Sequence, residues 1–289
     1  METQRCGTST ALSHSAWETV QSKSLVGIPG KIRVDFLGAA GAGKSTLYKR
    51  VLTGGRRRQW LTESEAYRSA IERYAKQVKS RPKGMLLKIP VVGDAYAHRI
   101  ERIAINRAFQ PYAEAHEAFL RIAADNFAQS NRSEYRRAEG YYNFIKTLRM
   151  WAFVEQFMPT RPVLSDESLS QKVYGILPKD CENVGVARNY FDEMPLPAAM
   201  VHITGDLGTI VTQIRDRQQQ TGRLIPAHQD IGDEELAKRT ASALSVATVG
   251  AETLLKRGVP VLTLQAGERL DDMVGDVREF LSALSHPTK

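Results

Sequence analysis

The sequence has few cysteines and no long apolar run. Its 289 residues include two cysteines, Cys6 and Cys181, which lie too far apart along the chain to suggest a disulfide framework or a metal knuckle. No apolar stretch approaches the roughly 20 residues needed to cross a bilayer. The polar segment 1–30 lacks the basic start and apolar centre of a signal peptide. We therefore expect a cytoplasmic protein without membrane association, with a polar and mobile leader over 1–30.

Low-complexity blocks and internal repeats are also absent, which excludes fibrous and repeat architectures. The chain is 42% hydrophobic and 25% charged, so it is suited to one large or two modest globular cores. Charge is unevenly distributed, because residues 56–161 contain 20 Lys and Arg against 11 Asp and Glu, in a chain of net charge +8. This excess favours an anionic partner, or it forms the solvated faces of several helices.

Short apolar runs alternate with helical periods along most of the chain. Four runs are predicted to be buried strands, at 31–37, 161–166, 198–204 and 259–264. The predicted helices that follow them are 45–52, 207–220, 233–256 and 270–284. This alternation predicts an α/β fold of three layers, with helices on both faces of a mostly parallel sheet.

Residues 56–160 interrupt this alternation with sequence rich in helix formers. We expect helices over roughly 62–80 and 95–109, a third that Pro111 opens and that reaches Phe127, and a fourth from Tyr141 that Pro159 ends. The predicted organisation is one α/β domain over 31–289, in which 56–160 is a helical insertion.

The stretch LGAAGAGKSTL, residues 37–47, has the spacing of a phosphate-binding loop. Gly-x-x-x-x-Gly-Lys-Ser is matched at every fixed position, after a predicted strand and at the start of a predicted helix. Glycines let backbone N–H groups approach phosphate oxygens, and a helix N-terminus favours negative charge. We expect Lys44 to lie between the β- and γ-phosphates and Ser45 to hold Mg²⁺. The residues predicted to bind nucleotide are Gly38, Ala39, Ala40, Gly41, Ala42, Gly43, Lys44, Ser45 and Thr46.

Two further groups of charged residues are candidates for catalysis. Asp166 and Glu167 follow a predicted strand, where either could order a metal-bound water or take a proton from a hydroxyl, unless the pair caps a helix. Basic residues at the end of helix 207–220 could close over a transferring phosphoryl group, or they suit the helix dipole. The catalytic candidates are Lys44, Asp166, Glu167, Arg215, Arg217 and Arg223, and the metal candidates are Ser45 and Asp166.

Taken in order, these features resemble the P-loop small-molecule kinases, in particular thymidylate and deoxynucleoside kinases, over 31–55 and 161–284. The resemblance implies a nucleoside-monophosphate-kinase-like fold, with ATP and Mg²⁺ as the phosphoryl donor. It also implies a lid at 215–223, a loop at 265–268 that borders the nucleobase near Gly267, and an acceptor-side subdomain at 56–160. The chain departs from these families after the third predicted strand, where Asp166-Glu167 replaces their Asp-Arg or Glu-Arg pair.

We therefore expect an ATP-dependent kinase of a small metabolite, such as a nucleoside, nucleotide or sugar, that acts by in-line phosphoryl transfer. One alternative is a P-loop ATPase that acts through a partner protein, because Glu167 could orient a hydrolytic water. Another is a nucleic-acid end kinase that uses the basic helices, although the sequence contains no recognised reader module. The acceptor, expected to be anionic or polar, the choice of ATP over GTP, and homodimer formation stay open.

Overall fold

The computed structural model describes residues 32–53, 60–79, 90–130, 132–157, 162–177, 184–222 and 231–285. Five strands within these ranges form one sheet in the order β2-β3-β1-β4-β5, and every neighbouring pair is parallel. The strands are β1 (Arg33–Gly38), β2 (Leu61–Thr62), β3 (Val163–Ser165), β4 (Ala199–Thr204) and β5 (Val261–Gln265). The predicted α/β class and parallel sheet are confirmed. The leader 1–30 lies outside the described residues.

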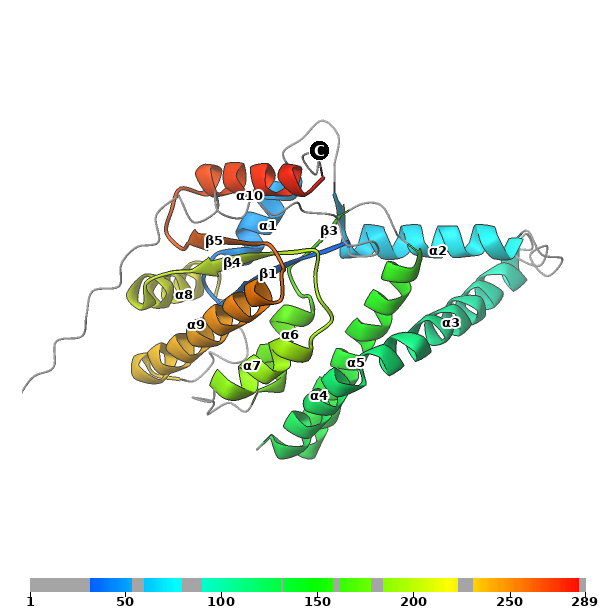
Figure 1. Cartoon of the computed structure of the whole chain (residues 1–289). Helices are drawn as coiled ribbons and strands as arrows, with labels where there is room; N and C mark the ends of the chain where they lie inside the picture. The colour runs from blue at the N-terminus through cyan, green and yellow to red at the C-terminus, as the bar shows by residue number, and fades with distance from the viewer. Residues whose placement is uncertain are drawn as a thin grey trace, which may run out of the picture.

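Helices cover both faces of the sheet (Figure 1). On one face, α1 (Lys44–Thr53) packs beside α10 (Leu270–Ser285). The other face carries α6 (Leu169–Ile176), α7 (Val184–Glu193) and α9 (Asp233–Lys256), and α8 (Leu207–Thr221) packs against α9. This arrangement is compatible with three layers. No helix in the described ranges is both long and apolar enough to cross a membrane.

The central strand β1 contributes side chains to two apolar cores. Val34 and Phe36 belong to the cluster that also contains Leu47 of α1 and Val277 of α10. Leu37 belongs to the second cluster, which is formed mainly by the helices of the opposite face and of the insertion. Successive side chains of a strand point to opposite faces, so Arg33 and Asp35 lie on the face opposite to Val34 and Phe36. Both charged side chains are fully buried, because helices cover that face of the sheet as well.

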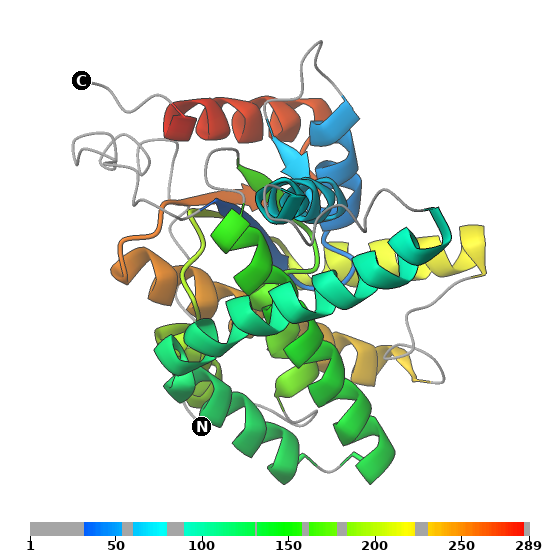
Figure 2. The ribbon, with the colours of Figure 1, turned by 90° about the vertical axis from the view of Figure 1, so that its right-hand side faces the viewer.

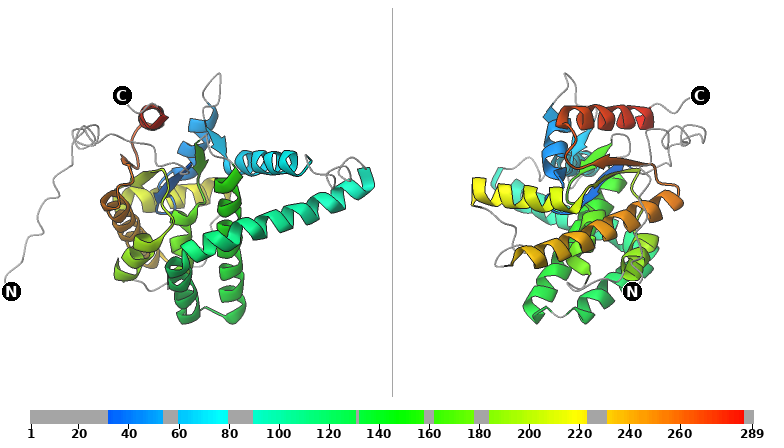
Figure 3. Two further views of the ribbon diagram at one scale, coloured as in Figure 1. Left: turned by 45° about the vertical axis from the view of Figure 1, so that its right-hand side comes forward. Right: turned by 90° about the vertical axis from the view of Figure 1, so that its left-hand side faces the viewer.

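The four helices between β2 and β3 gather on one side of the sheet (Figure 2). They are α2 (Glu63–Lys79), α3 (Pro90–Ala115), α4 (Glu117–Gln129) and α5 (Glu134–Phe157), and α2 and α3 extend away from the sheet (Figure 3). The described residues of this segment are mostly helical, as predicted, but the edge strand β2 was not predicted. Two residues are too few to produce a recognisable strand period.

The prediction that Pro111 opens a helix was wrong. Pro111 lies inside α3, and the helix continues for four more residues before His116 becomes the N-cap of α4. A proline inside a helix removes one backbone hydrogen bond and crowds the carbonyl four residues earlier. Here the chain tolerates that loss, and the break between the two helices follows about one turn later.

Candidate functional site

The strand order places two predicted features at the same edge of the sheet. After β1 the chain runs to the edge strand β2 and returns to β3, whereas after β3 it crosses to β4 on the other side of β1. In open α/β sheets, ligands bind outside the carboxyl ends of the strands where the order reverses in this way. Asp35 of β1 pairs in register with Ser165, the last residue of β3. The loop after β1 and the acidic turn after β3 therefore flank this point.

Residues 38–43, here called the glycine loop, have a backbone that requires glycine. Gly41 and Gly43 have φ angles of 90° and 88°, which residues with a Cβ rarely adopt. A Cβ at Gly38 would lie 2.5 Å from the carbonyl oxygen of Ile203, and one at Gly41 would lie 2.4 Å from the side chain of Ile214. A Cβ at Gly43 would meet no described atom within 4 Å. The loop thus packs tightly on β4 and α8 and stays open at its last glycine.

Lys44 begins α1 and folds back into the glycine loop. Its side chain is only 8% exposed, and its Nζ donates to the carbonyl oxygens of Gly38 (2.7 Å) and Ala39 (2.8 Å). Burial lowers the pKa of the Lys44 amine to about 8, although the carboxylates of Asp166 and Glu167 act in the opposite direction. An ammonium has three donors, so one remains for a ligand. A bound polyanion would stabilise the charged form.

The start of α1 adds a second feature that favours an anion. Ser45 and Thr46 are exposed at this end of the helix. The first turn of α1, which is described in full, contains no acidic residue that would compete with a bound anion. A helix N-terminus presents backbone N–H groups without intrahelical partners and a positive dipole end. The predicted phosphate contacts are therefore compatible with the geometry.

The two acids of the pair differ in their surroundings. The Oδ1 atom of Asp166 is buried and has no hydrogen-bond partner among the described residues. Glu167 is 72% exposed, and its carboxylate lies 3.6 Å from the Nζ of Lys172. The N-cap of α6 is neither of them but Ser168. Buried oxygens are normally hydrogen-bonded. The unpartnered Oδ1 of Asp166, rather than the exposed carboxylate of Glu167, is therefore the candidate ligand-binding atom of this pair.

Glu63, which the sequence analysis missed, lies beside this turn. It is the first residue of α2, directly after β2, and its Oε1 accepts a hydrogen bond from the hydroxyl of Ser165. Burial raises the pKa of the Glu63 carboxyl; the Ser165 hydrogen bond opposes this rise and the charge of Asp35 adds to it. A raised pKa is suited to taking up a proton near neutral pH.

A signal for Glu63 was present in the sequence. The stretch TESE, residues 62–65, forms a capping box. The Oγ1 of Thr62 accepts from the N–H of Glu65 at 3.2 Å, and the Oε2 of Glu65 accepts from the N–H of Thr62 at 2.9 Å. A capping box marks the start of a helix. Glu63 lies inside this box and follows the short apolar run Trp60-Leu61, so it is a candidate for the carboxyl edge of a sheet.

The predicted lid arginines point in different directions. One face of α8 covers the glycine loop at Gly41 through Ile210 and Ile214. Arg217 shares this face, because its spacing from them is i, i+4, i+7. The charge of Arg217 contributes to the lowered pKa of Lys44, as expected for a neighbouring cation.

Arg215 instead joins α8 to the start of α9. Its Nε lies 2.7 Å from the Oδ1 of Asp233, and its guanidinium also donates to the carbonyl of Ile231 at 3.2 Å. Its predicted role over a phosphoryl group stays a prediction. Arg223 lies outside the described residues.

Gly267 follows β5 at the same edge of the sheet, two strands from β1. Its φ angle is 96°, and a Cβ there would lie 3.4 Å from the Cγ2 of Thr209 in α8. The neighbouring Ala266 donates its N–H to the carbonyl of Thr204 at 2.7 Å, so the loops after β4 and β5 are packed together. The predicted contact of Gly267 with a nucleobase is not tested by these facts.

The oxygen groups near the glycine loop fit a Mg²⁺–nucleotide better than a dedicated metal cage. Within the described ranges, no group of three or more His, Cys, Asp or Glu could hold a metal ion. Mg²⁺ usually keeps several waters and takes one or two protein oxygens together with substrate phosphates. The exposed hydroxyl of Ser45 and the orphaned oxygen of Asp166 are two groups of this kind.

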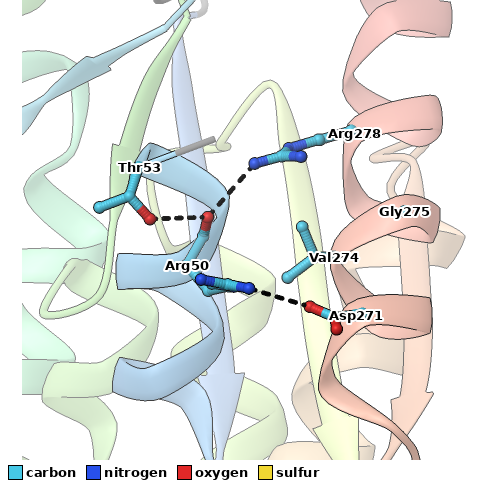
Figure 4. A pocket seen from close by; sticks show the side chains of 6 residues that line it. All are labelled: Arg50, Thr53, Asp271, Val274, Gly275 and Arg278. Carbon is cyan, nitrogen blue, oxygen red and sulfur yellow. Dashed lines mark hydrogen bonds and ion pairs between the residues drawn. The ribbon is translucent and has the colours of Figure 1, made fainter. Parts of the chain in front are cut away.

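A separate cavity lies between α1 and α10 (Figure 4). Its volume is about 430 Å³, and it is lined by Arg50, Thr53, Asp271, Val274, Gly275 and Arg278. Both arginines already have partners there: Arg50 bonds Asp271 at 3.3 Å, and Arg278 donates to the carbonyls of Arg50 and Val51. This cavity is at the carboxyl end of α1, roughly 15 Å along the helix from the glycine loop. It is not part of the candidate site.

A scan against protein-family models and a search of curated proteins found no match to this chain. The assignment of function therefore depends on the geometry of the site.

Proposed function

We propose that the protein is an ATP-dependent kinase that transfers a phosphoryl group to a hydroxyl of a small molecule. The observation that carries the proposal is the position of Lys44. Its ammonium is buried inside a glycine loop at the point where the strand order reverses, at the cost of a lowered pKa. Burying a cation without a carboxylate in direct contact is unfavourable, and such perturbed groups are characteristic of functional sites.

The donor triphosphate would bind to backbone and side-chain groups of one segment. The N–H groups of the glycine loop and of the first turn of α1 would donate to phosphate oxygens, and Lys44 would contribute its remaining donor. Arg217, on the face of α8 above the loop, would add positive charge where it develops during transfer. Ser45 and Asp166 would hold Mg²⁺, which would supply positive charge to neutralise the phosphate oxygens.

The acceptor would approach from the β2 and β3 side of the crevice. Glu63 is suited to receive the proton of an attacking hydroxyl, because its carboxyl is half-buried and has a raised pKa. Asp166 lies close enough to Lys44 to affect its pKa, so it faces the phosphate side of the site. Glu167 is exposed and paired with Lys172, so it is the least suited of the three carboxylates to contact a bound substrate.

ATP turnover by the purified protein tests this proposal. ADP formation is measured with Mg²⁺, first without acceptor and then with a panel of hydroxyl compounds and their phosphorylated counterparts. A kinase is expected to turn over ATP slowly alone and to be stimulated by one class of compound. Steady hydrolysis that no compound stimulates would instead support the ATPase alternative.

Lys44→Ala is the control variant for nucleotide binding. Removing the buried ammonium is expected to weaken ATP binding by more than about 30-fold, or about 2 kcal/mol. The unfolding temperature without nucleotide should stay close to that of the wild type. A wild-type protein whose unfolding temperature does not respond to ATP and Mg²⁺ would contradict the proposal.

A further inference from the structure

Asp35 holds the turn that carries Asp166 at both of its ends. The backbone of Asp35 pairs in register with Ser165, immediately before the turn. Its Oδ2 accepts a hydrogen bond from the hydroxyl of Ser170, in the first turn of α6 and just after the turn. Asp35, Ser165 and Ser170 are all fully buried. Bulk water therefore does not compete for these contacts.

Asp35 is itself fixed by Arg33 on the same strand. The Nε of Arg33 donates to the Oδ1 of Asp35 at 2.9 Å, which leaves Oδ2 for the Ser170 hydroxyl. The guanidinium also bonds Glu155 of α5 at 3.4 Å and lies 5.3 Å from the ring centre of Trp151. The carboxylate that receives Ser170 consequently has one orientation.

The contacts at the two ends of the turn keep the Oδ1 of Asp166 buried, although this position is unfavourable in free energy for the carboxylate itself. A buried carboxylate oxygen without a partner costs free energy that rotation toward water would recover. The Ser165 hydroxyl is bonded to Glu63, and the hydroxyl of Tyr190 donates to the carbonyl of Leu169 at 2.6 Å. Both ends of the turn are thus tied to neighbouring elements, and Asp166 keeps its Oδ1 buried.

We propose that Asp35 is a positioning residue for Asp166. Through Ser170 it fixes the turn 166–168, so that the orphaned oxygen of Asp166 faces a metal–nucleotide bound at the glycine loop. This inference rests on the proposed function, because the metal is expected only with a nucleotide. Without the Ser170 hydroxyl, the turn loses its side-chain contact with Asp35, and Asp166 relaxes away from the metal.

Metal affinity is the measurement that tests this role, with Mn²⁺ as a spectroscopic probe in place of Mg²⁺. The Kd of Mn²⁺ is measured by electron paramagnetic resonance in the complex with a non-hydrolysable ATP analogue. In Ser170→Ala this Kd should rise about tenfold, as is usual when an outer partner of a metal ligand is removed. Affinity for the analogue without metal should not change. Ser170→Thr, which keeps the hydroxyl, should restore Mn²⁺ binding.

Thr240→Val is the matched control for a loss of stability. Thr240 is also buried, and its hydroxyl donates to the carbonyl of Leu236 at 2.8 Å within α9. The variant removes one buried hydroxyl hydrogen bond from a different element, so its Mn²⁺ Kd should equal that of the wild type.

Three results would overturn the inference, and they are distinguishable. Equal Mn²⁺ Kd values in Ser170→Ala and wild type, with a raised Kd in Asp166→Ala, would show that Asp166 does not need this anchor. An unchanged Kd in Asp166→Ala would show that Asp166 does not meet the metal, although the nucleotide site would stand. A wild type that binds no nucleotide analogue would refute the proposed function itself.

Discussion

Two clusters of buried charge lie at opposite ends of β1, and they are built differently. In the first, Arg33 is bonded to the carboxylates of Asp35 and Glu155 and to a backbone carbonyl, so the cation is compensated within the protein. In the second, Lys44 has only loop carbonyls in the bonds described above, and Asp166 keeps a buried oxygen without a described partner. The charges of the first cluster are compensated within the protein, whereas we propose that a ligand compensates those of the second.

The pKa values of the two buried cations express this difference. Desolvation alone would lower the pKa of Arg33, but the charges of Asp35 and Glu155 outweigh it and raise the pKa above its usual value. Desolvation also acts on Lys44, and the more distant carboxylates do not compensate, so its pKa falls to about 8. Complete compensation indicates a structural role, and incomplete compensation indicates a binding site.

The largest expected effect is on the first cluster. Arg33→Met leaves the buried carboxylate of Asp35 and the partly exposed one of Glu155 without their cation, so it should reduce the free energy of unfolding by about 3–5 kcal/mol. Urea denaturation measures this loss. Arg50→Met is the control, because the pair of Arg50 with Asp271 is exposed and should contribute no more than about 1 kcal/mol. A similarly small loss of stability in both variants would contradict the structural role of the first cluster.

The second prediction concerns the pH dependence of nucleotide binding. The free protein loses the proton of Lys44 as the pH rises through about 8, whereas a bound triphosphate favours the charged amine and raises its pKa. Binding therefore takes up a proton, and ATP affinity should fall by up to about tenfold per pH unit above 8. Isothermal titration between pH 7 and 9.5, in buffers of different ionisation enthalpy, measures both effects.

Lys44→Arg is the control for this dependence. A guanidinium stays charged over the whole range, so the variant should bind with an affinity that does not fall between pH 8 and 9.5. An equal decline in the wild type and the variant would assign the dependence to another group.

The smallest expected effect is the change in stability when Asp166, in the second cluster, is replaced. Asp166→Ala removes a carboxylate whose Oδ1 is buried without a described partner, so the free energy of unfolding should stay within about 1 kcal/mol of the wild-type value or rise. Thermal and urea unfolding without nucleotide measure the change. A loss near that of Arg33→Met would mean that Asp166 serves the fold rather than a ligand.

Much of the architecture was predictable because it depends on local patterns. Four of the five described strands coincide with apolar runs, and the glycine loop follows from the spacing of a few residues. The failures have equally local causes. β2 is too short to show a period, and Pro111 is tolerated inside α3. Glu63 was overlooked because it begins a helix in a segment predicted to be entirely helical.

Spacing along the chain is sufficient to define the glycine loop, because its glycines, Lys44 and Ser45 are consecutive or nearly so. The carboxylates that accompany it cannot be identified in that way. Glu63 and Asp166 come to the same edge of the sheet as the loop because β3 inserts between β2 and β1, which brings three strand ends to that edge. Likewise, only the packing of α8 directs Arg217 toward Lys44 and Arg215 toward α9. Long-range strand order and helix packing follow from the energy of the whole core, which no short stretch of sequence contains.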